Sequence, residues 1–537
     1  MTPPTQGWSR RFSSRCRPSR SPVAPTRSSA ASSLRRCSAC LGSHNRLTIR
    51  PPQEAELEMR LPMGGSLIAG TLRQEGEMFP VENPATGEVT CELPAAPGGV
   101  VDAAVGAARQ AGRGEWGSMS PGRRQGLLEA LAAAVREHEE ELAELECLDN
   151  GVPLAIVRRF SVAALGRSLR YFAGWIDKFA GEVVPLTGGS ALDYLTREPY
   201  GVVVAISAYN TPSLYLGSKV APALAAGNTV VVKPSPLASL PALRFAELCT
   251  EAGLPAGTVN VVLGGAAVGS ALVAHPDVGK IGFTGSRTSG REVSRLAAEH
   301  LTPVSLELGG KSPNIVFADA DLSQVSAGAA LGAFALTGQA CAAGSRLFVH
   351  EDVLDTVIAS LEAAAQALPL GLPQDPTTVL GPLISAEHRE RVEGFLTRAV
   401  DSGAEVLCGG DRPGGELSGG YFLRPAVVVG ATDRSEVVTE EIFGPVVAVL
   451  PFRSEEEVVG RANASAYGLA AGIWTRDLSR AHRVARRLEA GFVWVNTYGT
   501  VPHTAPFGGV KQSGDAREGS RLALEDYTRA KNVYVQL

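Results

Sequence analysis

Two side chains in one glycine-rich stretch of the sequence could act together on a carbonyl compound. Glu307 lies near the start of residues 302–346, and Cys341 lies near their end. A thiol can attack a carbonyl carbon covalently, and a carboxylate can activate the water that cleaves the resulting thioester. A lone Cys is more often an inert core residue. The small neighbours of Cys341, Gly338 and Ala340 among them, nevertheless leave space for a substrate beside the thiol.

The elements that must position these side chains alternate between strand and helix. Apolar runs predict five parallel strands, at residues 201–207, 229–233, 258–263, 280–283 and 304–306. A second strand and helix pattern follows Cys341 and begins with a strand at 345–349 and a helix at 353–368. The sequence therefore predicts two α/β domains.

The residues before the first of these strands are mainly helical in pattern. Apolar side chains at helical spacing predict helices at 100–109, 123–147 and 169–178. Residues 83–87, Asn-Pro-Ala-Thr-Gly, predict a tight turn between two short strands.

A sheet of this kind binds a dinucleotide at the carboxyl ends of its strands, with phosphate at a helix N-terminus. No G-x-G-x-x-G sequence follows the first strand, so the phosphate-binding turn must lie elsewhere. Residues 283–290 read F-T-G-S-R-T-S-G, where a strand ends and a helix begins. Gly285 and Gly290 would let backbone amides approach a pyrophosphate, and Ser286 could donate its hydroxyl.

These motifs resemble the aldehyde dehydrogenase superfamily. Residues 307–313 (E-L-G-G-K-S-P) and 338–341 (G-Q-A-C) match two of its signatures, and 440–445 (E-E-I-F-G-P) and 506–514 match two more. With the motifs at Asn210, Lys233 and 283–290, seven occur in the family's order, so the resemblance spans residues 67–537.

The resemblance implies a Rossmann-like parallel sheet in a cofactor domain, a second α/β catalytic domain and a small β oligomerisation flap. The expected boundaries are 64–180 and 197–309 for the cofactor domain, 310–514 for the catalytic domain, and 181–196 with 515–537 for the flap. The flap implies a homodimer or homotetramer.

The resemblance also implies catalytic roles. Cys341 would be the nucleophile, Glu307 would activate water, and Asn210 would direct its amide at the aldehyde oxygen. The presence of Glu307 favours the free acid as product. Two alternatives remain open: a coenzyme A-acylating enzyme, and a catalytically silent binding or structural relative.

NAD is the cofactor that the resemblance implies. Many NAD-preferring members have Glu three residues after the lysine that binds the adenosine ribose, whereas this chain has Pro236 there. Loss of that carboxylate leaves NADP possible. The expected cofactor-binding residues are Lys233, Ser235, Gly285, Ser286, Gly290, Glu441, Phe443, Ser207 and Leu308.

Six residues are expected to line the substrate tunnel: Tyr171, Phe172, Tyr209, Thr211, Tyr498 and His503. The loop 497–505 at its mouth contains no Arg or Lys, which argues against a clamp for a substrate carboxylate. An apolar or aromatic aldehyde is therefore the expected substrate.

Composition limits the remaining possibilities. The chain has 537 residues, 45% of them hydrophobic, without an apolar run of about 18 residues, so a soluble globular protein without a membrane span is expected. All ten basic residues among the first 50 are Arg, and the rest of the chain is acidic, which argues against nucleic-acid binding. Scattered Cys and sparse His give no metal site.

Residues 1–63 differ in composition from everything that follows. They are rich in Arg, Ser and Pro and poor in aliphatic side chains, so disorder is expected. The segment resembles an organellar transit peptide. Alternatively, it reflects a gene start placed too far upstream, because Met59 and Met63 lie just before the globular sequence. A cytoplasmic enzyme is expected in the second case and a mitochondrial one in the first.

Overall fold

The computed structural model describes residues 46–49, 57–60 and 64–537. Most of the expected disordered segment 1–63 therefore lies outside the described residues. Within it, β1 (Arg46–Ile49) and β2 (Leu57–Arg60) form an antiparallel pair, which differs from the expected lack of structure at these eight residues.

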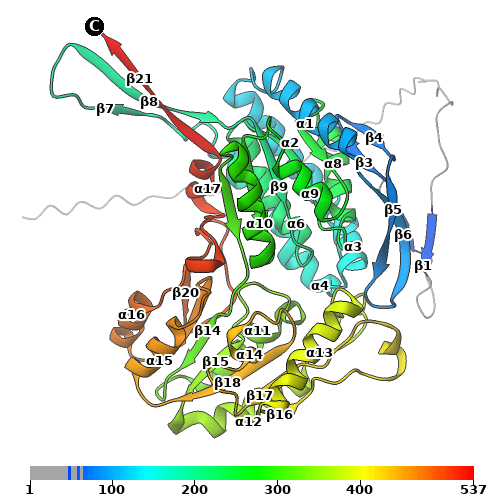
Figure 1. The fold of residues 1–537 in the computed structure, drawn as a ribbon, viewed down its shortest axis with the longest axis vertical. Helices are drawn as coiled ribbons and strands as arrows, with labels where there is room; N and C mark the ends of the chain where they lie inside the picture. Colours follow the sequence, from blue (N-terminus) through cyan, green and yellow to red (C-terminus); the bar gives the residue numbers. More distant parts are fainter. Residues whose placement is uncertain (1–45, 50–56, 61–63) are drawn as a thin grey trace, which may run out of the picture. The chain divides into compact units, whose positions relative to one another are not determined.

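The first large sheet contains seven strands (Figure 1). Five of them are parallel neighbours, as the apolar runs predicted. In spatial order the strands are β13 (Val304–Glu307), β12 (Lys280–Thr284), β9 (Val202–Ile206), β10 (Thr229–Lys233), β11 (Val259–Val261), β3 (Ser66–Ile68) and β4 (Thr71–Arg73).

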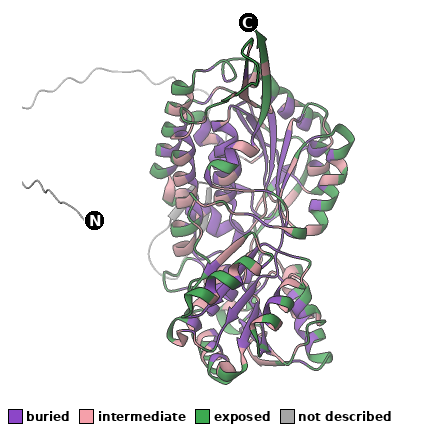
Figure 2. Cartoon of the chain, turned by 90° about the vertical axis from the view of Figure 1, so that its left-hand side faces the viewer, coloured by how far each residue is buried: buried purple, intermediate pink, exposed green. Residues whose placement is uncertain are grey.

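Helices cover this sheet on both faces, since its central strands β9, β10 and β12 are buried along their whole length (Figure 2). In α1 the buried positions Val101, Ala104, Val105 and Ala108 recur at helical spacing. The helices are α1 (Gly98–Arg113), α2 (Pro121–Glu137), α3 (Glu139–Asn150), α4 (Leu154–Ile156), α5 (Ala163–Ala173), α6 (Pro212–Tyr215), α7 (Ala221–Ala225), α8 (Leu240–Glu251), α9 (Ala266–Val273), α10 (Arg287–Ala297) and α17 (Ser520–Asp526).

Two details of these helices differ from the sequence prediction. The single helix expected at 123–147 is two helices, because His138 leaves the helical conformation (φ −103°, ψ 22°) between α2 and α3. Two π-helical turns, η1 (Val157–Val162) and η2 (Leu216–Val220), also interrupt the helical segments. Such turns are frequent at functional sites.

The second large sheet forms after residue 312 and is also mostly parallel. Its strands in spatial order are β16 (Glu405–Cys408), β17 (Ala426–Val429), β18 (Val446–Phe452), β15 (Arg346–His350), β14 (Pro313–Val316), β19 (Ala470–Trp474) and β20 (Phe492–Val495). Its helices are α11 (Leu322–Phe334), α12 (Leu354–Ala367), α13 (Ala386–Asp401), α14 (Glu436–Thr439), α15 (Glu455–Asn463) and α16 (Leu478–Arg487).

Two smaller β structures complete the fold. The expected turn at 83–87 joins β5 (Glu77–Asn83) to β6 (Glu88–Ala95), with Gly87 in the left-handed conformation (φ 73°). A three-stranded strip is formed by β7 (Glu182–Val184), β8 (Ala191–Pro199) and the last strand β21 (Thr528–Gln536), in the order β21-β8-β7. The mixed α/β class with parallel sheets is thus confirmed. No helix among the described residues is both long and apolar enough to cross a membrane.

Candidate active site

The residues that lead into the loop of Cys341 have a strained backbone conformation. Leu336, Thr337 and Gly338 are all left-handed, with φ of 55°, 57° and 70°. Left-handed backbone in residues other than glycine persists only where the surroundings enforce it. Here Gly338 packs so closely that a Cβ atom on it would lie 2.1 Å from the carbonyl oxygen of Gly444. The half-buried thiol of Cys341 is therefore presented by a fixed loop.

Burial raises the pKa of the Cys341 thiol far above its usual range, and the carboxylates of Glu307, Glu441 and Glu518 act in the same direction. The thiol is consequently neutral at pH 7 in this arrangement. The electrostatic effect of Glu307 on Cys341 also shows that the two expected catalytic groups share one site, although they come from different segments.

Glu307 is the last residue of β13 and is 4% exposed. Its Oε1 atom has no hydrogen-bond partner among the described residues, and a Cβ on Gly508 would lie 2.7 Å from that atom. Burial is the main reason that the pKa of Glu307 is well above its usual range, and Glu518 adds to the shift. An unpartnered buried carboxyl oxygen of this kind is available to a water molecule or a substrate.

Sequence reasoning missed a buried ion pair beside Glu307. The ammonium of Lys219, in η2, contacts the carboxylate of Glu518, and the two residues are 299 positions apart. Lys219 lowers the pKa of Glu307 whereas Glu518 raises it. One signal was available, because Lys219 is one of only seven Lys in a chain whose basic residues are otherwise Arg.

Asn210 follows β9 and is held from both sides. Its Nδ2 donates to the carbonyl of Gln339 (2.8 Å), two residues before Cys341. Its Oδ1 accepts from the hydroxyl of Tyr215 (2.9 Å), a residue that sequence reasoning also missed. The second Nδ2 hydrogen is not used in these contacts. The structure therefore brings Asn210 to the loop of Cys341, as expected.

Glu441 and two glycines lie on another side of this loop. The backbone N–H of Gly310 donates to Glu441 Oε1 (3.1 Å), and burial raises the pKa of Glu441 to about 7. A Cβ on Gly309 would lie 1.9 Å from Glu441 Oε2, and a Cβ on Gly310 would lie 2.3 Å from the carbonyl oxygen of Cys341. Only glycines fit between this carboxylate and the nucleophile loop.

Phe443 lies two residues after Glu441 in the same loop. It is left-handed (φ 59°), and its ring meets Tyr209 edge to face, with centroids 5.8 Å apart. Its carbonyl accepts from His388 Nε2 (2.7 Å). Tyr209 and Phe443, expected on sequence grounds at the tunnel and the cofactor, are therefore in direct contact.

The first sheet provides the residues expected to bind the dinucleotide. Lys233 ends β10, is 6% exposed, and donates to the carbonyl of Pro234 (3.1 Å). Burial lowers the pKa of Lys233 to about 8. Ser235 is half-buried in the same turn. The Ser207 N–H donates to the Lys233 carbonyl (3.2 Å), which joins the ends of β9 and β10.

Ser286 is the N-cap of α10, directly after β12 and Gly285, and its Oγ accepts from the N–H of Ser289. A Cβ on Gly290 would lie 2.6 Å from the Leu308 side chain. Leu308 thus packs beneath α10, and its backbone N–H donates to the carbonyl of Ser513 (2.9 Å). These residues fit NAD, because β10 and β12 end in a buried ammonium and a capped helix N-terminus.

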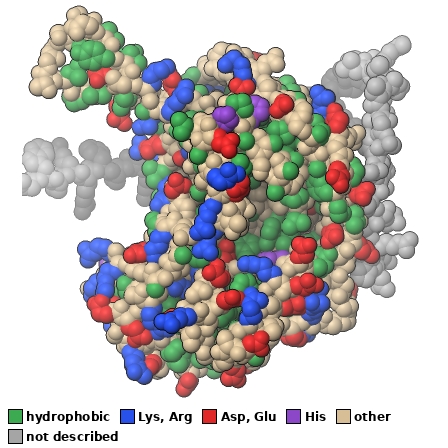
Figure 3. All heavy atoms as spheres, viewed as in Figure 1, with side chains coloured by type: hydrophobic (Ala, Val, Ile, Leu, Met, Phe, Trp, Pro, Cys, Tyr) green, Lys and Arg blue, Asp and Glu red, His purple; other side chains and the backbone are tan. Residues whose placement is uncertain are grey.

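The structure separates the six expected tunnel residues into two groups. Tyr171 is half-buried, and its ring meets His503 edge to face with centroids 5.3 Å apart. Thr211 is 4% exposed next to Asn210. Tyr209 and Thr211 flank Asn210 in the sequence. Figure 3 shows a hollowed, largely hydrophobic area on one face of the protein between the two α/β layers.

Phe172 and Tyr498 lie elsewhere than expected. Phe172 is 1% exposed in the core behind Tyr171. Tyr498 is 3% exposed, stacks on Trp494 and donates its hydroxyl to the carbonyl of Ala342 (2.9 Å). Both rings are buried in this structure, Phe172 in the core and Tyr498 against the loop of Cys341.

The expectation that the mouth of the tunnel lacks positive charge is wrong. Loop 497–505 has no Arg or Lys of its own, but α5 brings Arg167 and Arg170 close to it. The pKa of His503 is lowered mainly by burial and further by these two guanidinium groups. Positive charge is therefore present beside the loop.

Comparisons with known proteins identify the family of this chain. Residues 71–533 match the model of the Aldehyde dehydrogenase family. Betaine aldehyde dehydrogenase 1 of Rhizobium meliloti is 45% identical over 477 residues, which cover 88% of this chain and 97% of the relative. The 2-hydroxymuconic semialdehyde dehydrogenase of a Pseudomonas species is 44% identical over 469 residues, or 86% and 96% of the two chains.

Solved structures give the same result. An aldehyde dehydrogenase from Bacillus cereus in complex with NAD+ is similar with a TM-score of 0.86 and 43% identity, and the match covers 88% of this chain and 96% of that one. The match over most of both chains includes both large sheets. The chain therefore belongs to the aldehyde dehydrogenase family.

Proposed function

We propose that Cys341, Glu307 and Asn210 carry out the reaction of this enzyme, the NAD-dependent oxidation of an aldehyde to the free carboxylic acid. The observation that carries the proposal is the 2.8 Å hydrogen bond from Asn210 Nδ2 to the carbonyl of Gln339. It ties the end of β9 to the loop of Cys341, whose thiol is within electrostatic reach of Glu307.

The chemistry follows from these positions. The Cys341 thiol first loses its proton to solvent. The sulfur, as thiolate, then forms a bond to the aldehyde carbon, and the carbonyl oxygen becomes an oxyanion. The free Nδ2 hydrogen of Asn210 and the backbone N–H of Cys341 stabilise this oxyanion. Loss of such a donor typically slows a reaction by about 10²- to 10³-fold. NAD, when bound, accepts the hydride that leaves the same carbon.

The hydride loss leaves a thioester on Cys341. Glu307, once ionised, takes a proton from water as the water oxygen attacks the thioester carbon. The carbon–sulfur bond then breaks, and the carboxylic acid and the Cys341 thiolate are released. Lys219 and Glu518, in contact beside Glu307, are placed to adjust its charge.

The cofactor contacts are assigned to four groups of residues. Lys233 and Ser235 bind the adenosine ribose, the turn of Gly285, Ser286 and Gly290 receives the pyrophosphate, and Glu441 with Phe443 flanks the nicotinamide riboside. Ser207 and Leu308 contribute through their backbones. NAD is the cofactor, and because Pro236 carries no charge to repel a 2'-phosphate, NADP stays a possible second cofactor.

The substrate enters past Tyr171, His503 and Tyr209. The relatives' names point to aldehydes of opposite charge, a quaternary ammonium and a semialdehyde acid. Arg167 and Arg170 repel a cation near His503 and tolerate a neutral or anionic aldehyde. An uncharged apolar or aromatic aldehyde remains our proposed substrate. Because of these arginines, a semialdehyde acid becomes the alternative, and betaine aldehyde is disfavoured.

The experiment is NADH formation, followed by absorbance, with neutral, anionic and cationic aldehydes. Parallel reactions contain NADP in place of NAD, or added coenzyme A. Free acid without any need for coenzyme A is expected, and Cys341→Ala is expected to be inactive with every aldehyde. An acyl-coenzyme A product, or full activity of Cys341→Ala, would overturn the proposal.

Three broader assignments accompany this function. The proposed domain limits are 64–180 with 197–309, 310–514, and 181–196 with 515–537. The strip β7-β8-β21 joins copies of the chain into a homodimer or homotetramer, because β21 is an edge strand with exposed Tyr534 and Val535. The enzyme is cytoplasmic, as proposed from its bacterial relatives.

A further inference from the structure

The last turn of α3 contacts the catalytic loops although it carries none of the residues assigned above. Asn150 ends this helix and is 1% exposed. Its Nδ2 donates to the carbonyls of Tyr209 (3.2 Å) and Asn210 (3.4 Å), and its Oδ1 accepts from the N–H of Val152 (3.0 Å). The amide of Asn150 is thus fully used, and it fixes the backbone of the residue that donates to the oxyanion.

The preceding residue, Asp149, holds the neighbouring loop. It is 1% exposed, and its Oδ2 accepts from the N–H of Leu240 (2.7 Å), the first residue of α8. The Ser239 hydroxyl donates in turn to the carbonyl of Ser235 (2.9 Å), in the turn after Lys233. Two consecutive residues of α3 therefore hold the loops that leave the adjacent parallel strands β9 and β10.

Gly151, the residue directly after α3, contacts a third loop, at residues 381–382. Gly151 is left-handed (φ 73°), and a Cβ there would lie 2.5 Å from the Pro382 side chain. The carbonyls of Gly381 and Pro382 accept from the side chains of Thr337 (3.0 Å) and Gln339 (3.4 Å), in the approach to Cys341. The end of α3 thus contacts the segment that fixes the nucleophile loop.

We propose that Asn150 and Asp149 are positioning residues, Asn150 for the oxyanion amide of Asn210 and Asp149 for the Lys233 turn that receives the dinucleotide. The proposal rests on the function proposed above. Without the Asn150 donors, the carbonyls of Tyr209 and Asn210 turn toward other partners, and the Asn210 side chain turns with them. Without the Asp149 acceptor, the start of α8 and the Lys233 turn lose their anchor.

The two positions are tested with separate readouts. Asn150→Asp keeps the shape of the side chain, removes both donor hydrogens and places an oxygen against two carbonyls. The pre-steady-state burst of NADH is expected to slow by about 10²-fold, with the Kd of NAD within about twofold of wild type. Asp149→Ala is expected to raise the Kd of NAD by about tenfold, because the buried N–H of Leu240 loses its acceptor, with a near-normal burst at saturating NAD.

Conservative and matched variants separate positioning from stability. Asp149→Asn keeps an acceptor for the Leu240 N–H and is expected to restore NAD affinity. Asn228 provides the control for Asn150. It is 0% exposed, donates to the carbonyls of Ala223 (3.1 Å) and Tyr527 (2.9 Å), and accepts from the N–H of Gly201 (3.1 Å), at the other end of β9 and β10.

Asn228→Asp is expected to lower the Tm and leave the burst and the NAD affinity unchanged. If Asn150→Asp shows the same pattern, Asn150 is only structural and the inference is wrong. Asn210→Ala distinguishes this failure from that of the proposed function. A normal burst in Asn210→Ala would contradict the function itself, whereas a slow Asn210→Ala beside a normal Asn150→Asp would contradict only the positioning role.

Discussion

At the scale of single residues, the thiol of Cys341 and the carboxyl of Glu307 are both stabilised in their neutral forms. Burial raises the pKa of both Cys341 and Glu307, and the nearby carboxylates raise the pKa of Cys341 further. A raised thiol pKa means that the reactive thiolate is the minor form at pH 7 and increases as the pH rises. Most of Cys341 is therefore in the less reactive thiol form at neutral pH.

Thiol labelling tests this state directly. Alkylation of Cys341 by iodoacetamide in the cofactor-free enzyme is expected to be slower than that of free cysteine at pH 8. Its rate is expected to rise about tenfold per pH unit through pH 10, because each unit increases the thiolate tenfold. Mass spectrometry of the Cys341 peptide gives the rate, and a plateau below pH 8 would contradict the raised pKa.

The glycine beside Glu441 gives a second test at this scale. In Gly309→Ala the new methyl group would lie 1.9 Å from Glu441 Oε2, so the carboxylate must move away from Gly310. A lost hydrogen bond to a charged group predicts a Kd for NAD about tenfold higher, measured by fluorescence titration.

Gly126→Ala is the matched control for that variant. Gly126 lies in α2, and an added Cβ would meet no atom within 4 Å. Replacement of an exposed helical glycine by alanine is expected to stabilise the protein slightly and to leave NAD affinity unchanged. Equal NAD affinity in the two variants would exclude Glu441 from the cofactor site.

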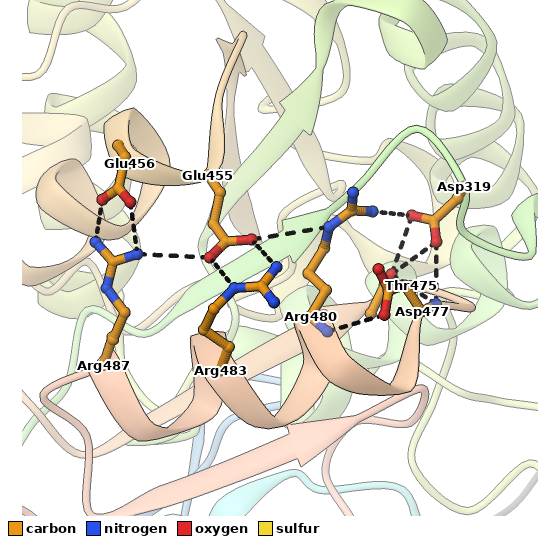
Figure 4. Close-up of polar contacts among 8 residues, drawn as sticks. All are labelled: Asp319, Glu455, Glu456, Thr475, Asp477, Arg480, Arg483 and Arg487. Carbon is orange, nitrogen blue, oxygen red and sulfur yellow. Dashed lines mark hydrogen bonds and ion pairs between the residues drawn. The ribbon is translucent and has the colours of Figure 1, made fainter.

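At the scale of elements, α15 and α16 are held together by a chain of ion pairs (Figure 4). Glu455 of α15 contacts Arg483 through both oxygens (2.8 and 2.7 Å), and it also lies near Arg480 (3.9 Å) and Arg487 (3.5 Å) of α16. Arg480 continues to Asp319 (2.7 Å) after β14. A network of this kind can stabilise, although an isolated exposed pair contributes little.

Glu455→Gln is expected to lower stability by about 1 kcal/mol at low ionic strength. The thermal unfolding temperature of the variant should approach that of wild type in 1 M NaCl, where exposed charges are screened. Glu292→Gln, which breaks a single exposed pair with Arg295, is the control and should show no measurable change. A salt-independent loss in Glu455→Gln would point to packing rather than charge.

Many of the strands and the loops that follow them could be predicted from the sequence. Strands β9, β10 and β12 are buried throughout, and runs such as Val202–Ile206 are uniformly apolar, so their positions are visible in composition alone. The loops that follow them carry Asn210, Lys233 and Ser286, which local motifs identify.

Contacts between distant segments could not be predicted in this way. Lys219 and Glu518 meet across 299 residues, and α5 places its arginines beside His503. Tyr498 is in a loop by pattern, yet its ring is enclosed by Trp494 and by three glycines from separate segments, Gly332, Gly344 and Gly472. Local periodicity reports which side of an element is apolar, and it contains no information on which other element covers that side.

At the scale of the whole molecule, the proposed oligomer depends on β21. This strand pairs with β8 along one edge, and Tyr534 on it is 58% exposed. Tyr534→Glu is expected to shift sedimentation equilibrium toward the monomer, because a charge on the edge strand opposes pairing with a second copy. Leu478→Glu, at a 72% exposed position in α16, should leave the mass unchanged. A monomeric wild-type protein would contradict the proposed interface.

The most direct test of the central claim is the mass of the Glu307→Gln variant after mixing with NAD and an aldehyde. Without the base that activates water, the thioester on Cys341 is expected to accumulate, since a general base typically contributes about 10²- to 10⁴-fold. One acyl group per chain on the Cys341 peptide and one NADH per chain are expected. Continued turnover without an adduct, or an adduct on another residue, would contradict it.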